Sequence, residues 1–182
     1  MVLRLFIINS FLLIYHYLLF PVILWLLSRT SPKKHQVDNT VEPSVTMIIS
    51  AKNEEKSIRR KIQNSLDLDY PRSKFSLVVV SDKSSDNTDS IVRKYADKGV
   101  KLIVNSEGSG KTAGINRAME SISTEIVVFS DANSMYSTDA IRKMVRHFAD
   151  PHVGFVVGYQ RYENISQTAA GNSEAVYWNI EF

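Results

Sequence analysis

From Val45 onward, short runs of β-branched and other apolar residues alternate with segments of helical periodicity. The predicted strands are SVTMIIS at 44–50, FSLVVVS at 75–81, VKLIV at 100–104, EIVVFS at 125–130 and VGFVVGY at 153–159. Strands that alternate with helices usually form a parallel sheet covered by those helices. The pattern therefore predicts an α/β fold with a mostly parallel, Rossmann-like sheet flanked by helices.

The predicted helices follow the strands and carry apolar residues three or four positions apart. Their apolar stripes comprise Ile58, Ile62 and Leu66, then Ile91, Val92, Tyr95 and Ala96, and finally Ile141, Val145 and Phe148 within 138–149. Pro71 should end the first helix, because proline disfavours a helical residue before it, and Gly99 should close the second. We also expect a helix through Ile122 and an aromatic helix at 173–182.

The N-terminal part of the sequence is a long apolar run. Residues 5–27 include no Asp, Glu, Lys or Arg, and about 20 apolar residues suffice for a helix to cross a membrane. A signal peptide is the competing interpretation, but the run is longer than a usual signal-peptide core and no small-residue cleavage site follows it. We expect a membrane anchor at 1–28 and a polar linker at 29–44.

Basic residues flank this run unequally. Arg29, Lys33 and Lys34 follow it, whereas Arg4 alone precedes it. Because Lys and Arg are enriched at the cytoplasmic ends of membrane helices, we expect a single-pass protein of the cytoplasmic membrane. Its globular domain, 45–182, would lie on the cytoplasmic side.

The overall charge of the chain excludes few functions. The formal net charge is +3, from 22 Lys and Arg against 19 Asp and Glu. This mild balance gives no signature of nucleic-acid binding, and we expect no such partner. The chain has no cysteine, which excludes disulfides and thiolate metal sites.

A polar loop follows each of the first four predicted strands. The loops read SAKNEE at 50–55, SDKSSDNT at 81–88, NSEGSGKT at 105–112 and SDANS at 130–134. Ligands of open α/β sheets bind beyond the carboxyl ends of the strands. These four loops together are therefore the candidate binding site.

The third loop, NSEGSGKT, is close to a phosphate-binding P-loop. A Walker A sequence, G-x-x-x-x-G-K-[ST], requires glycine where this chain has Asn105. Asparagine tolerates positive φ better than most residues, and EIVVFSD at 125–131 resembles a Walker B strand. A P-loop NTPase therefore stays open as an alternative, although it leaves SAKNEE and SDKSSDNT without a role.

Taken in order, the four loops resemble those of family 2 glycosyltransferases with the GT-A fold. The resemblance runs from about Pro43 to the end of the chain and rests on A-x-N-E-E, the acidic second loop, G-K-x-x-x-x-N and D-x-N. It implies an inverting hexosyl- or N-acetylhexosaminyl-transferase that uses a nucleotide-sugar donor, foremost a UDP-sugar. The acceptor would be a glycan or a lipid-linked acceptor at the membrane.

The resemblance assigns the base and the ribose of the donor to the first two loops. Ala51, Asn53 and Glu54 match the family segment that holds base and ribose, and Asp82 matches the aspartate that recognises the base. The alternative for Asn53 and Glu54 is capping of the following helix. Lys52 stands where the family often has an aromatic residue, so stacking on the base is in doubt.

The fourth loop matches the D-x-D motif of the family, which carries a divalent cation against the diphosphate. Asp131 and Asn133 are therefore the predicted ligands of Mg²⁺ or Mn²⁺, both of which prefer oxygen ligands. Asn133 replaces a second aspartate and so gives up one negative charge. A β-turn stabilised by an Asx motif is the alternative for this segment.

The third loop supplies two further matches. Lys111 corresponds to the family lysine that reaches toward the donor, and an anion at this helix start would suit its charge. Asn116 corresponds to an asparagine in the same helix, with an ordinary surface residue as the alternative. For Asp86 and Thr88 in the second loop, capping of a helix is the favoured interpretation.

No catalytic base can be assigned. In inverting members of the family the general base is an aspartate in a segment that would lie beyond Phe182. The resemblance thus implies that this chain is the donor-binding part of a longer enzyme, truncated and inactive by itself. A membrane-anchored nucleotide-sugar binder or pseudoenzyme is the alternative.

Overall fold

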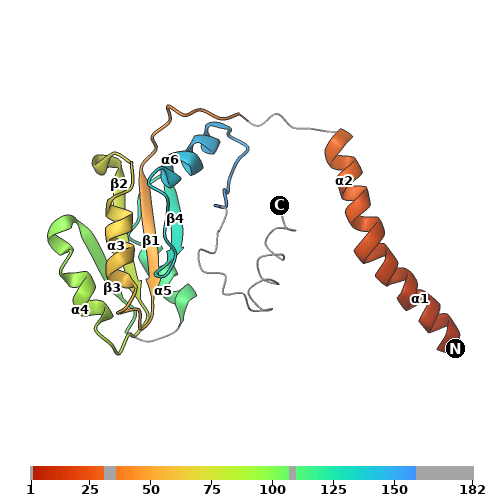
Figure 1. Cartoon of the computed structure of the whole chain (residues 1–182), viewed down its shortest axis with the longest axis horizontal. Helices are drawn as coiled ribbons and strands as arrows, with labels where there is room; N and C mark the ends of the chain where they lie inside the picture. Colours follow the sequence, from red (N-terminus) through yellow and green to blue (C-terminus); the bar gives the residue numbers. More distant parts are fainter. Residues whose placement is uncertain (1, 31–35, 107–109, 159–182) are drawn as a thin grey trace, which may run out of the picture. The chain divides into compact units, whose positions relative to one another are not determined.

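The computed structural model describes residues 2–30, 36–106 and 110–158. The chain divides into two compact units between Gln36 and Val37. The first contains a single long helix, and the second a parallel sheet covered by helices (Figure 1). The aromatic helix predicted at 173–182 lies outside the described residues.

The first unit is one continuous helix made of α1 (Val2–Ile14), the π-helical turn η1 (Tyr15–Leu19) and α2 (Phe20–Thr30). Pro21 explains the π turn, because proline has no N–H to bond the carbonyl four residues back. In the residue before this proline, the N–H of Phe20 bonds the carbonyl of Tyr15, five residues back, as in a π-helix.

The length and the apolar character of this helix agree with the prediction. Within its span Val2–Arg29, the most apolar 18-residue window has a mean hydropathy of 2.0 and is not buried within the protein. The structure thus confirms a helix that is long and apolar enough to cross a membrane. Its insertion and its orientation in a membrane stay predictions.

The second unit is built on a four-stranded sheet in the order β3-β2-β1-β4. All neighbouring strands are parallel, as predicted. The strands match the first four predicted ones and are β1 (Val45–Ala51), β2 (Phe75–Ser81), β3 (Val100–Val104) and β4 (Ile126–Asp131). The four polar loops therefore leave the same edge of the sheet.

Helices cover both faces of the sheet (Figure 1). One face packs against α3 (Ile58–Leu66), α4 (Thr88–Arg93) and α6 (Ala140–Val145), and the other against α5 (Lys111–Met119). Because successive side chains of β1 point to opposite faces of the sheet, this strand contributes to the apolar layers on both faces. Met47 and Ile49 belong to the first layer and Ile48 to the second, and all three are fully buried.

Three short 3₁₀ turns complete the unit, η2 (Arg72–Lys74), η3 (Ala96–Lys98) and η4 (Arg146–Ala149). The helices predicted after the second and fourth strands are therefore shorter than expected, because their last turns tighten into η3 and η4. Gly99 closes η3 with a φ of 82°, in the left-handed conformation predicted for it.

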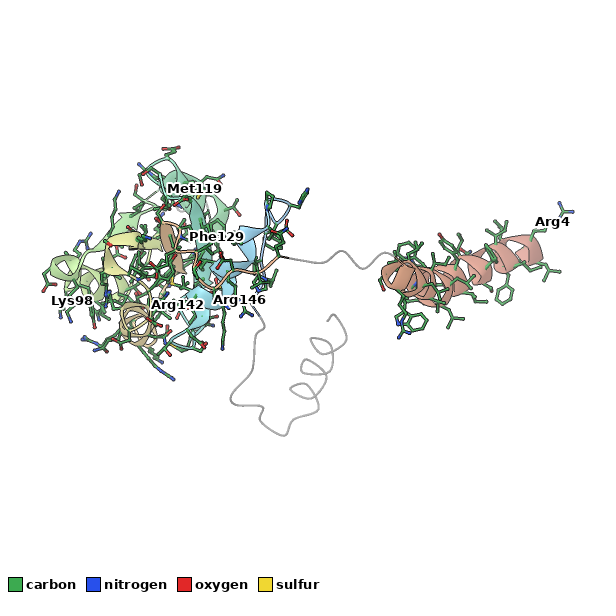
Figure 2. All side chains as sticks on the ribbon, turned by 90° about the horizontal axis from the view of Figure 1, so that it is seen from above. Arg4, Lys98, Met119, Phe129, Arg142 and Arg146 are labelled. Carbon is green, nitrogen blue, oxygen red and sulfur yellow. The ribbon has the colours of Figure 1, made fainter. Side chains whose placement is uncertain are left out.

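The fifth predicted strand is wrong over residues 153–158, which form no strand; residue 159 lies outside the described part. Two side chains of this run face solvent, since Phe155 is 79% and Val157 is 59% exposed. β-branched residues form a strand only where a neighbouring strand pairs with them. Within 36–106 and 110–158, β4 instead ends the sheet, and its Phe129 is 55% exposed (Figure 2).

Candidate functional site

The sheet register brings the four loops together at one edge. Ala51 lies beside Ser81, Ser50 beside Asp131 and Ser81 beside Val104. Neighbouring strands therefore end within one residue of each other in the register, and the polar residues that follow them lie at the same end of the sheet. We call this the four-loop edge, formed by the described parts of 50–55, 81–88, 105–112 and 130–134.

The first two loops are interlocked by hydrogen bonds. The side-chain oxygen of Asn53 accepts from the N–H of Ser85 at 2.8 Å, and the Asn53 N–H donates to Ser84 Oγ at 3.1 Å. The Glu54 N–H donates to Thr88 Oγ1 at 2.8 Å. Asn53, with a φ of 56°, thus joins the loops rather than capping α3.

The carboxylates of Asp86 and Glu54 accept hydrogen bonds at the N-termini of α4 and α3. Asp86 Oδ1 accepts from the N–H of Thr88, the first residue of α4, at 2.9 Å, but the N-cap residue of α4 is Asn87, so the predicted capping by Asp86 or Thr88 is not confirmed. Burial acts to raise the pKa of Asp86, but hydrogen bonds from Thr88 and from the N–H of Glu55 outweigh it and hold that pKa below its usual value. The Glu54 carboxylate accepts a hydrogen bond from Ser57 at the start of α3.

Asp82 is the buried acid of the site, with 5% of its surface exposed. Its Oδ1 accepts from Asn105 Nδ2 at 2.8 Å, and its Oδ2 lies 3.3 Å from Lys52 Nζ. The Asp82 N–H donates to the carbonyl of Ala51 at 2.9 Å. The sequence analysis assigns no function to Asn105 or Lys52. Asn105 could have been placed beside Asp82, because β2 and β3 are neighbours and each of these residues directly follows its strand.

Lys111 and Asp131 join the third and fourth loops. Lys111 Nζ lies 2.5 Å from Asp131 Oδ1, and the side chains are 59% and 55% exposed. Lys111 is the first residue of α5, and Gly110 before it has a φ of 93°. The ammonium group of Lys111 therefore lies against one oxygen of the predicted metal ligand.

Asn133 and Asn116 are less closely tied to the site. Asn133 is exposed two residues after Asp131, in a turn closed by the Ser134 N–H on the Asp131 carbonyl at 3.3 Å. Asn116 is exposed on α5, and none of the described residues hydrogen-bonds its side chain. Five helical positions after Lys111, it lies about 140° round the helix from that lysine. The structure does not bring Asn116 into contact with the other predicted residues.

The oxygen donors fit a cation that is held jointly by protein and phosphate. Among the described residues, no group of three or more His, Cys, Asp or Glu side chains could hold a metal. Asp131 and Asn133 supply one carboxylate and one amide. Mg²⁺ is typically bound by one or two carboxylates together with substrate phosphates, so this donor set fits such an ion beside a diphosphate.

Sequence reasoning missed Lys61, which is fully buried beneath the fourth loop. Its Nζ donates to the carbonyl of Ser134 at 2.5 Å. The signal was present, because Lys61 falls three residues after Ile58 and four before Ser65, on the face of α3 that is buried.

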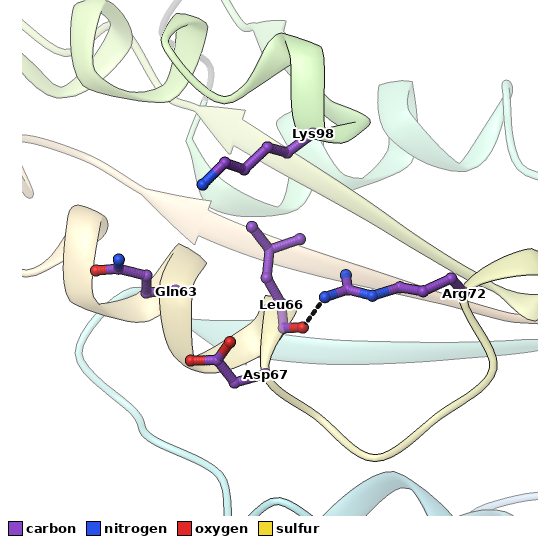
Figure 3. A pocket seen from close by; sticks show the side chains of 5 residues that line it. All are labelled: Gln63, Leu66, Asp67, Arg72 and Lys98. Atoms are coloured by element: carbon purple, nitrogen blue, oxygen red, sulfur yellow. Dashed lines mark hydrogen bonds between the residues drawn. The ribbon is translucent and has the colours of Figure 1, made fainter.

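A cavity of about 330 Å³ lies away from these loops (Figure 3). Gln63, Leu66, Asp67, Arg72 and Lys98 line it. Arg72 donates a hydrogen bond to the carbonyl of Leu66. Because these residues end α3 and precede β2 and β3, the cavity is at the amino ends of the strands and is not part of the four-loop edge.

Comparison with known proteins identifies the family. Residues 46–181 match the model of glycosyl transferase family 2. The probable glycosyltransferase YdaM of Bacillus subtilis (strain 168) is 30% identical over 69% of this chain and 31% of its own length. The poly-beta-1,6-N-acetyl-D-glucosamine synthase of Staphylococcus aureus (strain COL) is 28% identical over 74% and 32%. The chain thus spans about a third of these curated relatives.

Solved structures agree with this assignment. The mannosyltransferase PcManGT from Pyrobaculum calidifontis, in complex with GDP-Man and Mn²⁺, has a TM-score of 0.66 and 34% identity over 74% of this chain and 41% of its own. S. aureus TarS 1-349 in complex with UDP-GlcNAc has a TM-score of 0.54 and 28% identity over 60% and 32%. The parallel sheet with its covering helices is a GT-A fold, and the chain belongs to glycosyl transferase family 2.

Proposed function

We propose that this protein binds a nucleotide-sugar donor at the four-loop edge for glycosyl transfer at a membrane. The observation that carries the proposal is the contact of 2.5 Å between Lys111 and Asp131, which joins a cation and a carboxylate from neighbouring loops. A diphosphate-sugar with its metal ion requires both kinds of group in one place. The P-loop alternative would use the same two residues, as Walker A lysine and Walker B aspartate, but it leaves the first two loops without a role.

The nucleoside would be held by the first two loops. Asp82 is proposed to accept a hydrogen bond from the base, as a carboxylate does from a uracil N–H. Lys52 is exposed and pairs with Asp82 in the ligand-free protein, so it would have to release one carboxylate oxygen. Ala51, Asn53 and Glu54 would line the rest of the nucleoside site. Asn53 would act indirectly, through its hydrogen bond from the backbone N–H of Ser85.

The diphosphate would lie between the third and fourth loops. Asp131 and Asn133 would hold Mg²⁺ or Mn²⁺, and the ion would offset the negative charge that develops on the leaving diphosphate. Lys111 would leave Asp131 and pair with a phosphate oxygen. Asn116 belongs to this proposal only if α5 turns toward the donor, because its side chain is solvent-exposed on the helix.

The donor is proposed to be a UDP-sugar, and the transfer to be an inverting one of a hexosyl or N-acetylhexosaminyl group. TarS was solved with UDP-GlcNAc, and the S. aureus relative is a poly-N-acetylglucosamine synthase. PcManGT was solved with GDP-Man, so GDP is the nucleotide to compare. A glycan or a lipid-linked acceptor at the cytoplasmic face of the membrane is the proposed acceptor.

Donor binding is the activity to expect of the assigned residues, since none of them is a general base. A membrane-anchored binder without catalysis is therefore the second candidate function. Transfer and binding are separable by product analysis. Sugar transfer from a radiolabelled UDP-sugar by the 182-residue chain would contradict the proposal that this chain alone is inactive.

Calorimetry on the full chain in detergent tests donor binding. UDP, GDP and ATP are titrated with and without Mn²⁺ into wild type, Asp131→Ala and Lys111→Ala. Asp97→Ala, an exposed carboxylate at the amino ends of the strands, is the control. We expect Mn²⁺-dependent UDP binding that Asp131→Ala abolishes and Asp97→Ala leaves intact. ATP binding that survives Asp131→Ala and disappears in Lys111→Ala would revive the P-loop interpretation.

A further inference from the structure

Lys61 is a fully buried cation in the core of the second unit. It lies on α3 between Ile58 and Ile62, both also fully buried. Burying an ammonium is costly unless its charge and its N–H donors are compensated. A leucine or methionine would fill the same space without that cost, so packing alone does not explain the lysine.

The polar contacts of the Lys61 ammonium lead to the segment that follows β4. Its Nζ donates to the carbonyl of Ser134 at 2.5 Å and lies 4.1 Å from the centre of the Tyr136 ring. No Asp or Glu of the described residues forms an ion pair with it. Burial lowers the pKa of Lys61 to about 8, while the negative charge of Asp131 acts to raise it. The negative charge that acts on Lys61 is thus that of a proposed metal ligand.

Asn64, one helical turn further along α3, binds the same segment. Its Nδ2 donates to the carbonyl of Tyr136 and its Oδ1 accepts from the N–H of Tyr136, both at 2.8 Å. Lys61 and Asn64 together therefore bind three backbone groups of Ser134 and Tyr136. These residues directly follow Asp131 and Asn133, and the Ser134 N–H closes the turn on the Asp131 carbonyl.

We propose that Lys61 and Asn64 are positioning residues that hold the loop 130–134 in the geometry needed for the metal ion and the diphosphate. The inference rests on the proposed function of that loop. It assigns to α3 a role beyond covering the sheet, since the helix carries the groups that support the fourth loop from beneath. The hydrogen bonds of both side chains go to the backbone of Ser134 and Tyr136, so we assign them a positioning and not a catalytic role.

The test uses the full chain in detergent and a pair of conservative changes. Lys61→Met keeps an unbranched side chain, one atom shorter, and removes the ammonium, whereas Lys61→Arg keeps a charged donor. Arg60→Met, on an exposed neighbour, controls for loss of charge on α3. Ile62→Val, at a fully buried neighbour, controls for a general loss of stability.

Two measurements separate positioning from packing. The first is hydrogen exchange without ligand, in which Lys61→Met should speed exchange at 134–136 and leave β2 unchanged. The second is calorimetry with UDP and Mn²⁺. Because a hydrogen bond from a charged donor is lost, we expect Lys61→Met to weaken binding at least about tenfold. Lys61→Arg should recover part of this affinity, and both controls should bind as wild type does.

Wild-type affinity in Lys61→Met, with the protein folded, would overturn the inference and leave the proposed function standing. Should that variant fail to fold, Asn64→Asp tests the same positioning role. It keeps the acceptor for the Tyr136 N–H and loses the donor to the Tyr136 carbonyl. Unchanged UDP affinity in Asn64→Asp would then overturn it. Absence of any nucleotide binding by wild type would overturn the proposed function, and this inference with it.

Discussion

The side-chain amide of Asn105 donates a hydrogen bond of 2.8 Å to the buried carboxylate of Asp82. Asn105 is 3% exposed and occupies the position at which a Walker A loop requires glycine. Among the described residues other than glycine, only Asn53 and Lys83 have a positive φ. Asn105 therefore does not make the turn of a P-loop, and its side chain orients the acid proposed to bind the base.

Restoring the Walker glycine should damage the protein rather than create an ATPase. Asn105→Gly removes a hydrogen bond to a charged, buried group, which typically contributes about 1.5–3 kcal/mol. We expect the free energy of unfolding to fall by about 2 kcal/mol, measured by urea denaturation of the detergent-bound chain with circular dichroism. Ser106→Gly, at an exposed neighbour, supplies the backbone control. ATP hydrolysis by Asn105→Gly would contradict this prediction.

The Lys111–Asp131 pair should matter for binding and not for stability. Both side chains are more than half exposed, and exposed ion pairs contribute about 0–1 kcal/mol. Lys111→Met should therefore leave the free energy of unfolding nearly unchanged and weaken Mn²⁺-dependent UDP binding about tenfold. Lys143→Met is the matched control, because Lys143 pairs with Asp139 at 2.6 Å with similar exposure. Equal UDP affinities in wild type and Lys111→Met would refute the role of Lys111.

The close approach of α5 to the sheet should make Gly114 intolerant of any side chain. A Cβ at Gly114 would lie 2.7 Å from Cγ1 of Val80, a buried and β-branched residue of β2. Although alanine favours a helix by about 1 kcal/mol over glycine, we expect Gly114→Ala to lower the free energy of unfolding by about 1–2 kcal/mol through overpacking.

A double-mutant cycle in urea checks the cause of that loss. Combined with Val80→Ala, Gly114→Ala should cost less than it does in the wild-type background, because the clashing methyl group is gone. Gly154→Ala is the control, since no atom lies within 4 Å of a Cβ built there. Additive effects of the two substitutions would show that Val80 is not the obstacle.

Much of the fold and part of the site could be predicted because the signals are local. The four strands are β-branched runs, and Asp82, Lys111 and Asp131 stand directly at strand or helix ends. The fifth strand failed because pairing, and not the apolar run at 153–158, decides whether a strand forms. Lys61 and Asn64 were missed because a polar residue in a helix is usually exposed, and only the path of the segment after β4 reveals their partners.

The titration of Lys61 predicts how stability depends on pH. Burial lowers the pKa of Lys61 to about 8 in the folded protein, whereas an unperturbed lysine has a pKa of about 10.4. Between these values the unfolded chain binds more protons at this side chain than the folded protein does. The free energy of unfolding should therefore rise with pH in this window.

Urea denaturation of wild type and Lys61→Met at pH 7, 8, 9 and 10 measures this contribution. The stability of wild type relative to Lys61→Met should increase by about 2 kcal/mol from pH 8 to pH 10, since each pKa unit corresponds to about 1.4 kcal/mol. The series stops at pH 10 because burial, and then the charge of Glu42, raises the pKa of Tyr70 to about 12. Above about pH 10 that tyrosine would lower stability as the pH rises, opposing the slope due to Lys61. A wild-type curve parallel to that of Lys61→Met would show that Lys61 stays charged throughout, held by the Ser134 carbonyl and by Asp131.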